Sequence, residues 1–320
     1  MNIKIGPNEA GQRLDKFLRK YLKDVPLSAI FKALRKKDIR VNGSKKNEKY
    51  FLEEGDIVEI RYIKTNSQNI KKDFEQVEVN GLKIIYEDEN IIIVEKWPEI
   101  LVHSDGNEEE PSLTDYVLSY LYKKGFYDPQ KETTFVPSPC NRLDRNTSGI
   151  VMFGKTYEGL KEINAAIRED KIKKYYYTLC KGRISDGVYN AYIVKNHDTN
   201  ISKIYKESVE DSKKITMKVK TIQSNGAYSL LEINLITGRS HQIRAHLSYL
   251  GNPVAGDSKY GDKEINSVLL NKYGLNYQFL YAYKLNFRAM SGKLEYLQNK
   301  TITAALPPFL KKIKHDIFKF

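Results

Sequence analysis

The chain has 320 residues, enough to bury one sizeable hydrophobic core and a second, smaller one. Its formal net charge is +13, and it has only two cysteines, so neither a disulfide framework nor a cysteine-rich metal cluster is expected. No stretch approaches the roughly 20 apolar residues of a membrane span, and the N-terminus lacks the apolar run of a signal peptide. We therefore expect a cytoplasmic protein with no membrane association.

The positive charge is unevenly distributed along the chain. Residues 1–70 carry a net charge of +7, residues 71–111 carry −8, and residues 112–320 carry +14. Two basic blocks separated by an acidic stretch suit two surfaces that face a polyanion, most simply nucleic acid. The alternative is a lysine-rich surface that is merely solvated, and charge alone does not choose between the two.

Residues 1–64 are predicted to form a small module of two helices and a short hairpin. Apolar residues recur at helical spacing in residues 14–22 and 27–34. The segment "DIRVNG" alternates as a strand does and ends in the tight-turn pair Asn42-Gly43, and "EEGDIVEIRY" gives another strand. The basic second helix and hairpin predict a clamp for an RNA backbone rather than a generic helical cap. The contact residues expected there are Arg35, Lys36, Lys37 and Arg40.

A polar stretch without periodicity, residues 65–81, is predicted to be a linker to a larger domain at 82–320. That domain opens with two β-rich runs in "LKIIYEDENIIIVEK", followed by a capping box of Ser112 and Asp115 before a helix. A helix around residues 157–167 and strands at "KYYYTLCKG" and "YSLLEINL" follow. Because strands and helices mix without βαβ repeats, we expect an α+β fold around a mixed, largely antiparallel sheet.

The segment "CNRLDRNTSGI" (140–150) places Asp144 between Arg142 and Arg145. Two prolines just before it favour an extended chain, in which Arg142 and Asp144 share an accessible face while Leu143 points into the core. A polar turn and an apolar run follow directly. A surface salt bridge accounts for the charges, but it does not account for the turn or for the apolar run behind it.

The segment "LITGRSHQIRAHL" (235–247) is the second candidate. Gly238 allows a tight turn before a helix with an apolar face, and Arg244 flanks that face, so it borders the core. A basic surface helix is the alternative. The two histidines are five residues apart and do not form the i, i+4 pair that favours zinc. The helix is expected to carry Arg239, His241, Arg244 and His246.

The strand "KKYYYTLCKG" is the third candidate. Tyr175 and Tyr177 would share one face and Tyr176 the other, which presents a single ring for stacking on a base. Tyrosine runs are also common in ordinary strands, so this signal is weak alone. No dinucleotide, phosphate-loop, zinc-protease or nucleophile-elbow motif occurs. Cys140 is expected to be structural rather than a thiol nucleophile.

Together these segments resemble the RluA-type pseudouridine synthase family. The signature H-R-L-D-x-x-T-S-G corresponds to residues 141–149, and K-x-Y-x-A-x-x-x-G aligns Lys174 and Tyr176, with threonine in the alanine position. The motif T-G-R-T-H-Q-I-R-x-H-L corresponds to residues 237–247, and P-x-x-G-D-x-x-Y-G is complete from 253 to 261. Residues 1–62 similarly resemble the αL-type RNA-binding domain that often precedes this catalytic domain.

Three departures from the family pattern stand out. Asn141 replaces the common histidine, so this position is expected to orient the loop rather than perform chemistry. The segment "KWPEILVHS" replaces K-P-x-G-x-x-V-H-P, so the path from Trp97 to His103 is expected to differ. Tyr281 stands in the histidine position of L-H-A-x-x-L-x-F. None of these changes removes the aspartate, tyrosine or arginine on which the implied reaction depends.

The resemblance implies conversion of uridine in RNA to pseudouridine, in which the uracil is cut from the sugar, turned, and rejoined through ring carbon 5. Asp144 is then the essential carboxylate, Arg244 its charge partner, and Tyr176 the ring that stacks on uracil. Whether Asp144 attacks the sugar, adds to the base or removes a sugar proton stays open. No metal or other cofactor is implied, and we expect a monomer. Further RNA contacts are expected from Arg142, Arg145, Lys174, Arg239 and His241.

Two alternatives from other classes are less favoured. A non-catalytic RNA-binding or assembly factor would have no need of the set Asp144, Tyr176 and Arg244. A carboxylate-dependent glycosidase would need a second acid, and none stands near Asp144 in the sequence. Large-subunit ribosomal RNA is the expected substrate, because the αL-type module commonly accompanies it in this family, and transfer RNA is the second candidate.

Overall fold

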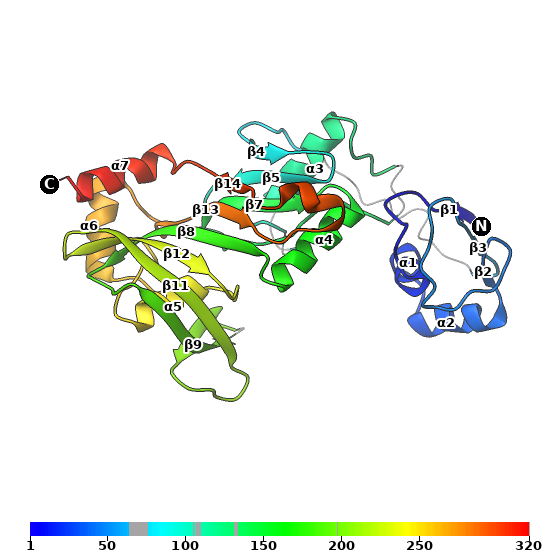
Figure 1. Ribbon diagram of the computed structural model, residues 1–320, viewed down its shortest axis with the longest axis horizontal. Helices are drawn as coiled ribbons and strands as arrows, with labels where there is room; N and C mark the ends of the chain where they lie inside the picture. Colours follow the sequence, from blue (N-terminus) through cyan, green and yellow to red (C-terminus); the bar gives the residue numbers. More distant parts are fainter. Residues whose placement is uncertain (64–75, 105, 107–109, 131–133, 197, 320) are drawn as a thin grey trace.

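The computed structural model describes the chain except residues 64–75, 105, 107–109, 131–133, 197 and 320 (Figure 1). The described residues form two separate β-sheets, one of three strands and one of eleven. The small sheet has its own hydrophobic core, and the large sheet has a core on each face. Helices and a largely antiparallel, mixed sheet confirm the expected α+β class.

The N-terminal unit packs two helices on the three-stranded sheet. Helix α1 (Leu14–Tyr21) and helix α2 (Leu27–Lys36) bury the apolar faces that their sequence spacing predicted. The strands β1 (Asn2–Lys4), β3 (Ile57–Ile60) and β2 (Ile39–Val41) lie in that order, and all pairs are antiparallel.

The expected short hairpin of this unit is only partly correct. Asn42 and Gly43 both have positive φ, as the tight turn requires. The chain, however, pairs back on Val41 only through Ser44, because the lysine-rich stretch that follows lacks strand alternation. Strand β3 therefore comes much later in the chain, and it takes the central place between β2 and the unanticipated β1.

A single mixed sheet organises the larger unit. Its neighbouring strands are antiparallel except for β13 and β7, which are parallel. In spatial order the strands are β10 (Ile201–Tyr205), β9 (Gly187–Asn196), β11 (Lys213–Ser224), β12 (Tyr228–Leu235), β8 (Ile172–Lys181), β13 (Leu280–Phe287), β7 (Ser148–Gly154), β5 (Ile91–Lys96) and β4 (Lys83–Glu87), with β14 (Thr301–Thr303) on β13 and β6 (Ser138–Pro139) on β7.

Helices cover both faces of this sheet. Helices α4 (Tyr157–Arg168), α6 (Lys263–Tyr273) and α7 (Pro308–Ile317) contribute to the core of one face. Helices α3 (Leu113–Lys123) and α5 (Gln242–Tyr249) contribute to the core of the other, which we call the α3/α5 face. A short 3₁₀ helix, Gly292–Leu297, packs near α4.

Strand β8 alternates between the two cores as its sequence predicted. Tyr175 and Tyr177 pack on the α4 side, whereas Tyr176 belongs to the core of the α3/α5 face. The predicted capping box is also present: the Ser112 N–H donates to the Asp115 carboxylate, and the Ser112 side chain accepts from the backbone of Asp115. The sheet thus presents one tyrosine ring of this run to the face where α5 lies.

Gly149 permits the close approach of the two parallel strands. It pairs with Ala282 of β13, has φ of +119°, and a Cβ here would lie 2.2 Å from the Ala282 carbonyl oxygen. Strand β7 can therefore start directly against β13. The turn that precedes β7 is held by a hydrogen bond from the Gln278 amide to the Thr147 hydroxyl.

Two further expectations have their outcomes here. The expected linker, 65–81, lies largely outside the described residues; near its end, the N–H of Val77 donates to the Ser119 hydroxyl on α3. The helix expected to carry Arg239 and His241 begins only at Gln242. Its start is later because the Gln242 carboxamide oxygen accepts from the Arg239 N–H and from the Thr237 hydroxyl, which holds that stretch as a turn. No helix of the described residues is long and apolar enough to cross a membrane.

Candidate active site

Two adjoining hollows of about 710 and 270 Å³ open beside the α3/α5 core, and they share the Asp144 loop. The smaller one, which we call the inner chamber, has Tyr176 and Lys174 among its lining residues. The larger one, the outer cleft, extends toward Lys195 and Lys259. Of the predicted site residues, the outer cleft is lined by Arg142, Asp144, Arg145, His241 and Arg244, and the inner chamber by Arg142, Asp144, Lys174, Tyr176, Arg239, His241 and Arg244.

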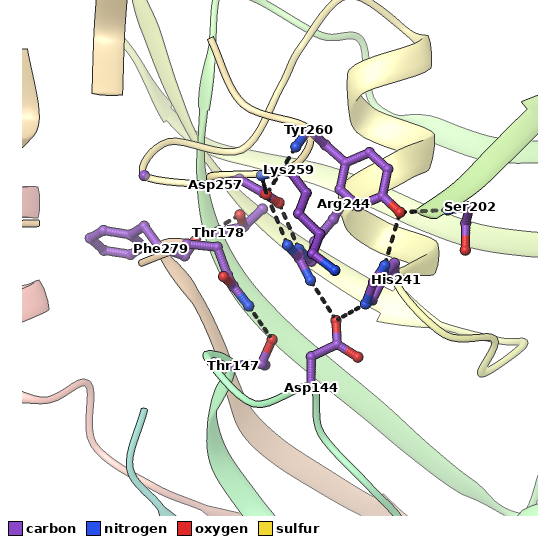
Figure 2. Close-up of polar contacts among 12 residues, drawn as sticks. Asp144, Thr147, Thr178, Ser202, His241, Arg244, Asp257, Lys259, Tyr260 and Phe279 are labelled. Atoms are coloured by element: carbon purple, nitrogen blue, oxygen red, sulfur yellow. Dashed lines mark hydrogen bonds and ion pairs between the residues drawn. The ribbon is translucent and has the colours of Figure 1, made fainter. Parts of the chain in front are cut away.

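The centre of the site is an arginine held between two aspartates (Figure 2). Arg244 Nη1 donates to Oδ2 of Asp144 at 3.0 Å. Arg244 is thus the charge partner that the family pattern predicted for Asp144, although the two residues are one hundred positions apart in the chain. On its other side, Nε and Nη2 of Arg244 donate to the two oxygens of Asp257 at 2.6 and 2.9 Å. Such a bidentate pair fixes the guanidinium plane, and so fixes the direction from which it meets Asp144.

The positive charge of Arg244 is stabilised by the two aspartates around it. Burial acts to lower its pKa, but the hydrogen bonds and charge of Asp257 and the charge of Asp144 outweigh burial and raise it. The helix on which it sits is no surface helix, because residues 242–247 are all buried. The alternative of a basic surface helix is therefore wrong.

Tyr176 and Lys174 lie on the wall of the inner chamber. Burial, helped by the nearby charge of Asp144, raises the pKa of Tyr176, so the phenol is neutral at ordinary pH. Burial also lowers the pKa of Lys174, against a smaller opposing effect of Asp170. The chamber thus joins an aromatic face, an amine and the carboxylate of Asp144.

Strand β6 ends at Pro139, and beyond it the Cys140 N–H donates to a carbonyl oxygen of β7 before the Asp144 loop begins. The expected alternation still holds, since Arg142 is exposed and Leu143 is buried. Asn141 accepts a hydrogen bond from the Met152 N–H at 2.9 Å, so this side chain ties the loop to β7.

A buried lysine, Lys96, ties the Asp144 loop to residues 97–100 through hydrogen bonds to backbone carbonyls. Lys96, at the end of β5, is 0% exposed, and its Nζ donates to the carbonyl oxygens of Trp97, Ile100 and Arg145. Burial lowers its pKa to about 7, with Asp144 opposing the shift. The guanidinium of Arg145 donates in turn to the Glu99 carbonyl, so Lys96 and Arg145 together join residues 97–100 to the turn after Asp144.

Several residues that shape the site carried no predicted role. Asp257 and Tyr260 lie in the P-x-x-G-D-x-x-Y-G segment, and Asp257 lines neither hollow but holds Arg244 from behind. Its distance of thirteen residues from Arg244 gave no sign of contact, since a loop and not one helix joins them. Lys96 opens the segment in which the sequence departs from the family pattern, and its burial beneath the loop was not foreseen.

The remaining candidates do not join this centre. Arg35, Lys36 and Lys37 are exposed on and just after α2, in the N-terminal unit, and Arg40 lies on β2 of the same unit (Figure 1). None of the four lines either hollow. Cys140 does line both, but burial raises the pKa of its thiol to about 12, which disfavours a thiolate nucleophile.

Family comparisons account for both units of the chain. A family model described as RNA pseudouridylate synthase matches residues 90–249, and a model of the S4 domain matches residues 12–58. The first match covers the Asp144 loop, β8 and α5, and the second covers both helices of the N-terminal unit.

Curated relatives match over most of the chain. An uncharacterized RNA pseudouridine synthase of Mycoplasma capricolum subsp. capricolum is 35% identical over 305 residues, which cover 93% of this chain and 95% of the relative. The ribosomal large subunit pseudouridine synthases C of Vibrio vulnificus and Escherichia coli K12 are each 32% identical over 89% of this chain, and over 87% and 88% of their own lengths.

Solved structures agree with the fold. Human RNA pseudouridylate synthase domain containing 4 has a TM-score of 0.57 at 23% identity, over 73% of this chain and 92% of the human chain. These matches define an RNA-modifying enzyme, an isomerase, with an S4 domain in front of its catalytic part. The chain belongs to the RluA-type family of RNA pseudouridine synthases, as its motifs predicted.

Proposed function

We propose that this enzyme isomerises uridine in large-subunit ribosomal RNA and that Asp144 is its essential carboxylate. The observation that carries the proposal is the placement of Asp144 between the two hollows, with one oxygen held by an arginine that Asp257 fixes from behind. A carboxylate oriented in this way can act as a nucleophile or base without rearranging its partner.

The reaction needs no co-reactant, because all atoms of uridine reappear in pseudouridine. The bond between the sugar carbon C1′ and uracil N1 breaks, the base turns, and C1′ bonds to carbon 5, whose proton is released while N1 gains one. Asp144 acts at the sugar or base during these steps, and Arg244 balances its charge in the buried site. The enzyme's task is to hold the cut base and the sugar close enough to rejoin.

The inner chamber is the proposed seat of the uracil. The ring of Tyr176 offers a neutral aromatic face on its wall, which suits stacking. A base reaches such a chamber only after it has left the helical stack of the RNA. The exposed side chain of Arg142, beside Asp144, is placed to occupy the space that the base leaves.

The two units divide the work. We assign RNA-backbone binding to residues 1–64 and catalysis to residues 82–320, with 65–81 between them. The basic residues Arg35, Lys36 and Lys37 on the S4 unit suit phosphate contacts, as do Arg239 and Arg145 near the site. Ribosomal RNA is favoured over transfer RNA because relatives at 32% identity are named for the ribosomal large subunit.

A pseudouridine map of cellular RNA tests the substrate and the catalytic residue together. The gene would be expressed as wild type and as Asp144→Asn in cells that lack it. The expected result is one or more pseudouridines in large-subunit ribosomal RNA that depend on the wild-type gene and are absent with Asp144→Asn. Sites only in transfer RNA would overturn the ribosomal assignment, and sites that persist with Asp144→Asn would overturn the role of Asp144.

A further inference from the structure

A second side chain of the α5 segment approaches the proposed catalytic carboxylate. His241 lies directly before α5 with φ of +57°, a left-handed conformation that turns its ring toward the site. Its Nε2 lies 3.9 Å from Oδ2 of Asp144, and its Nδ1 lies 2.8 Å from the hydroxyl of Tyr260 (Figure 2). The histidine ring is therefore placed between the Tyr260 hydroxyl and the carboxylate.

The hydrogen bonds of Tyr260 determine where the proton of His241 sits. The Tyr260 hydroxyl accepts a hydrogen bond from the backbone N–H of Ser202 at 2.7 Å. The hydroxyl has one proton of its own, and His241 Nδ1 is the acceptor that the structure offers it. A neutral ring that accepts at Nδ1 must carry its proton on Nε2, which is the nitrogen that faces Asp144.

The chain of hydrogen bonds rests on backbone that is itself held in place. Strand β10 is the edge strand of the large sheet, so the outward N–H of Ser202 is available to a side chain. The N–H of Tyr260 donates to Oδ1 of Asp257, the same carboxylate that clamps Arg244. Both groups that approach Asp144 are therefore positioned from one scaffold.

We propose that His241 is a positioning residue for Asp144, locked by Tyr260 and Ser202 as the neutral tautomer whose Nε2–H points at Oδ2. This proposal rests on the catalytic role proposed above for Asp144. The gap of 3.9 Å is too long for a hydrogen bond in the free enzyme. Catalytic hydrogen bonds often tighten only when substrate is bound, and a shift of the Asp144 loop by about 1 Å would close this one.

Two donors on one oxygen would make the carboxylate asymmetric. Arg244 and His241 both approach Oδ2 of Asp144, and within the described part of the chain no group donates to its other oxygen, Oδ1. Oδ1 is therefore the oxygen left for the nucleotide. A partial rotation of the carboxylate away from this orientation would move the bound oxygen away from both donors.

The neutral state of His241 suits this task. Burial lowers its pKa; of the charged groups around it, Arg244 and Lys259 act in the same direction, whereas Asp144 and Asp257 oppose them. A neutral N–H orients the carboxylate without adding a second positive charge beside Arg244. A second cation would stabilise the carboxylate further and make it a weaker nucleophile or base.

The tautomer can be measured directly in the full-length protein. Long-range proton–nitrogen correlation spectra of protein labelled with ¹⁵N-histidine distinguish Nδ1–H, Nε2–H and the imidazolium. The protein has five histidines, and the signal of His241 is identified by its loss in His241→Gln. We expect the Nε2–H form in the wild type at neutral pH, and a mixture of tautomers in Tyr260→Phe. An Nδ1–H or imidazolium signal in the wild type, or an unchanged pure tautomer in Tyr260→Phe, would overturn the lock.

Turnover measurements test whether the Nε2–H of His241 that faces Asp144 contributes to the reaction. His241→Leu removes the donor, and we expect kcat to fall about 10- to 100-fold with little change in KM, because a misplaced catalytic group costs rate rather than binding. His241→Gln places an amide N–H near the Nε2 position and should recover most of the loss. Equal loss in both variants, or a rise in KM alone, would overturn the positioning role.

Controls separate this proposal from simpler causes. His315→Gln, on the exposed side of α7, should leave turnover unchanged. Fluorescence of the single tryptophan, Trp97, during unfolding reports whether each variant is folded, and Tyr260→Phe provides a milder test if His241→Leu is not. The tautomer of His241 is measured without substrate, so that result does not depend on the catalytic role of Asp144. The proposed role of Asp144 is tested separately, and it is wrong if Asp144→Asn remains active.

Discussion

The two carboxylates that hold Arg244 have the same chemistry but opposite surroundings. The side chain of Asp257 is 0% exposed, and besides two bonds from Arg244 it accepts the backbone N–H groups of Lys259 and Tyr260. The side chain of Asp144 is 25% exposed and accepts one bond from Arg244, at the junction of two hollows. Asp257 thus uses its oxygens to fix a cation, whereas Asp144 keeps one available.

This difference shows how a buried charge can serve orientation rather than stability. Taking an ion pair out of water costs about as much as the attraction returns, so the pair of Asp257 and Arg244 adds little net stability. Removing one member of the pair lowers stability strongly, because it leaves the other charge buried without a partner. Asp257 therefore fixes the position of the Arg244 guanidinium. Arg244 in turn fixes the orientation of the more exposed Asp144 carboxylate.

Asp144→Asn should have the largest effect on activity and a small one on stability. The amide keeps the size of the side chain and can still accept from Arg244, but it is a far weaker nucleophile and base. We expect turnover to fall by at least about 10⁴-fold, as when an essential nucleophile is lost. Single-turnover assays on ribosomal RNA fragments would measure it.

Unfolding followed by Trp97 fluorescence provides the matching control for Asp144→Asn. The midpoint should move little, because Asp144 is partly exposed and makes one bond. A large loss of stability with residual turnover would show that Asp144, and not Asp257, is the structural member of the pair.

Asp257→Asn should show the reverse balance. A guanidinium can only donate hydrogen bonds, so the amide NH₂ of asparagine finds no acceptor on Arg244. Arg244 stays buried and keeps one of its two hydrogen bonds to residue 257. We expect a loss of about 3–5 kcal/mol in the free energy of unfolding, the usual cost of breaking a buried pair. Turnover should also fall, by a smaller factor than for Asp144→Asn, because Arg244 is no longer aimed.

An exposed ion pair gives the comparison for Asp257→Asn. Glu169 pairs with Lys171 at the surface, and Glu169→Gln should leave both stability and turnover nearly unchanged. If Asp257→Asn behaved like Glu169→Gln, the clamp would not be what positions Arg244.

The elements of this fold were largely predictable because their signals are local. Helix α4, strand β12 and the Ser112 capping box each follow from spacing or short-range hydrogen bonds within one segment. Strand β1 was missed because three residues carry too little pattern, and they become a strand only by pairing with β3. The tight turn at Asn42-Gly43 formed as expected, yet it did not decide which strand would pair next.

The site was predictable where a motif encodes it and obscure where folding assembles it. The pairing of Asp144 with Arg244 was expected from the family pattern, and the structure places the two groups 3.0 Å apart. The clamp by Asp257 and the support by Lys96 depend on loops that meet only in the folded chain. A buried lysine or aspartate gives no periodic signal, since its partners are backbone groups or side chains remote in sequence.

Lys96→Met should loosen the Asp144 side without touching the Asp257 side. Methionine keeps most of the length of the lysine stem, but the carbonyls of Trp97, Ile100 and Arg145 lose their shared donor. We expect a loss of about 1–3 kcal/mol in stability from the unsatisfied oxygens. Turnover should fall about tenfold, because the turn beside Asp144 is less well placed.

The outcome for Lys96→Met is informative in either direction. Unchanged turnover together with lowered stability would mean that the loop keeps its geometry through Asn141 and its bond to β7. Fluorescence remains usable as the probe of unfolding, because Trp97 itself is retained in this variant.

The smallest effect concerns acid pH and α5, the helix that carries Arg244. His246 is 1% exposed, its Nδ1 has no partner within the described residues, and burial lowers its pKa to about 4 from an ordinary value of 6.5. As the pH falls below 6.5, the unfolded chain takes up a proton here that the folded chain refuses, so stability is complete above that pH and declines below it. The expected cost is about 2 kcal/mol by pH 5. Urea unfolding of wild type and His246→Gln at pH 7 and pH 5 measures it; an equal decline in both would place the acid sensitivity elsewhere, with His241, whose pKa burial also lowers, the next group to test.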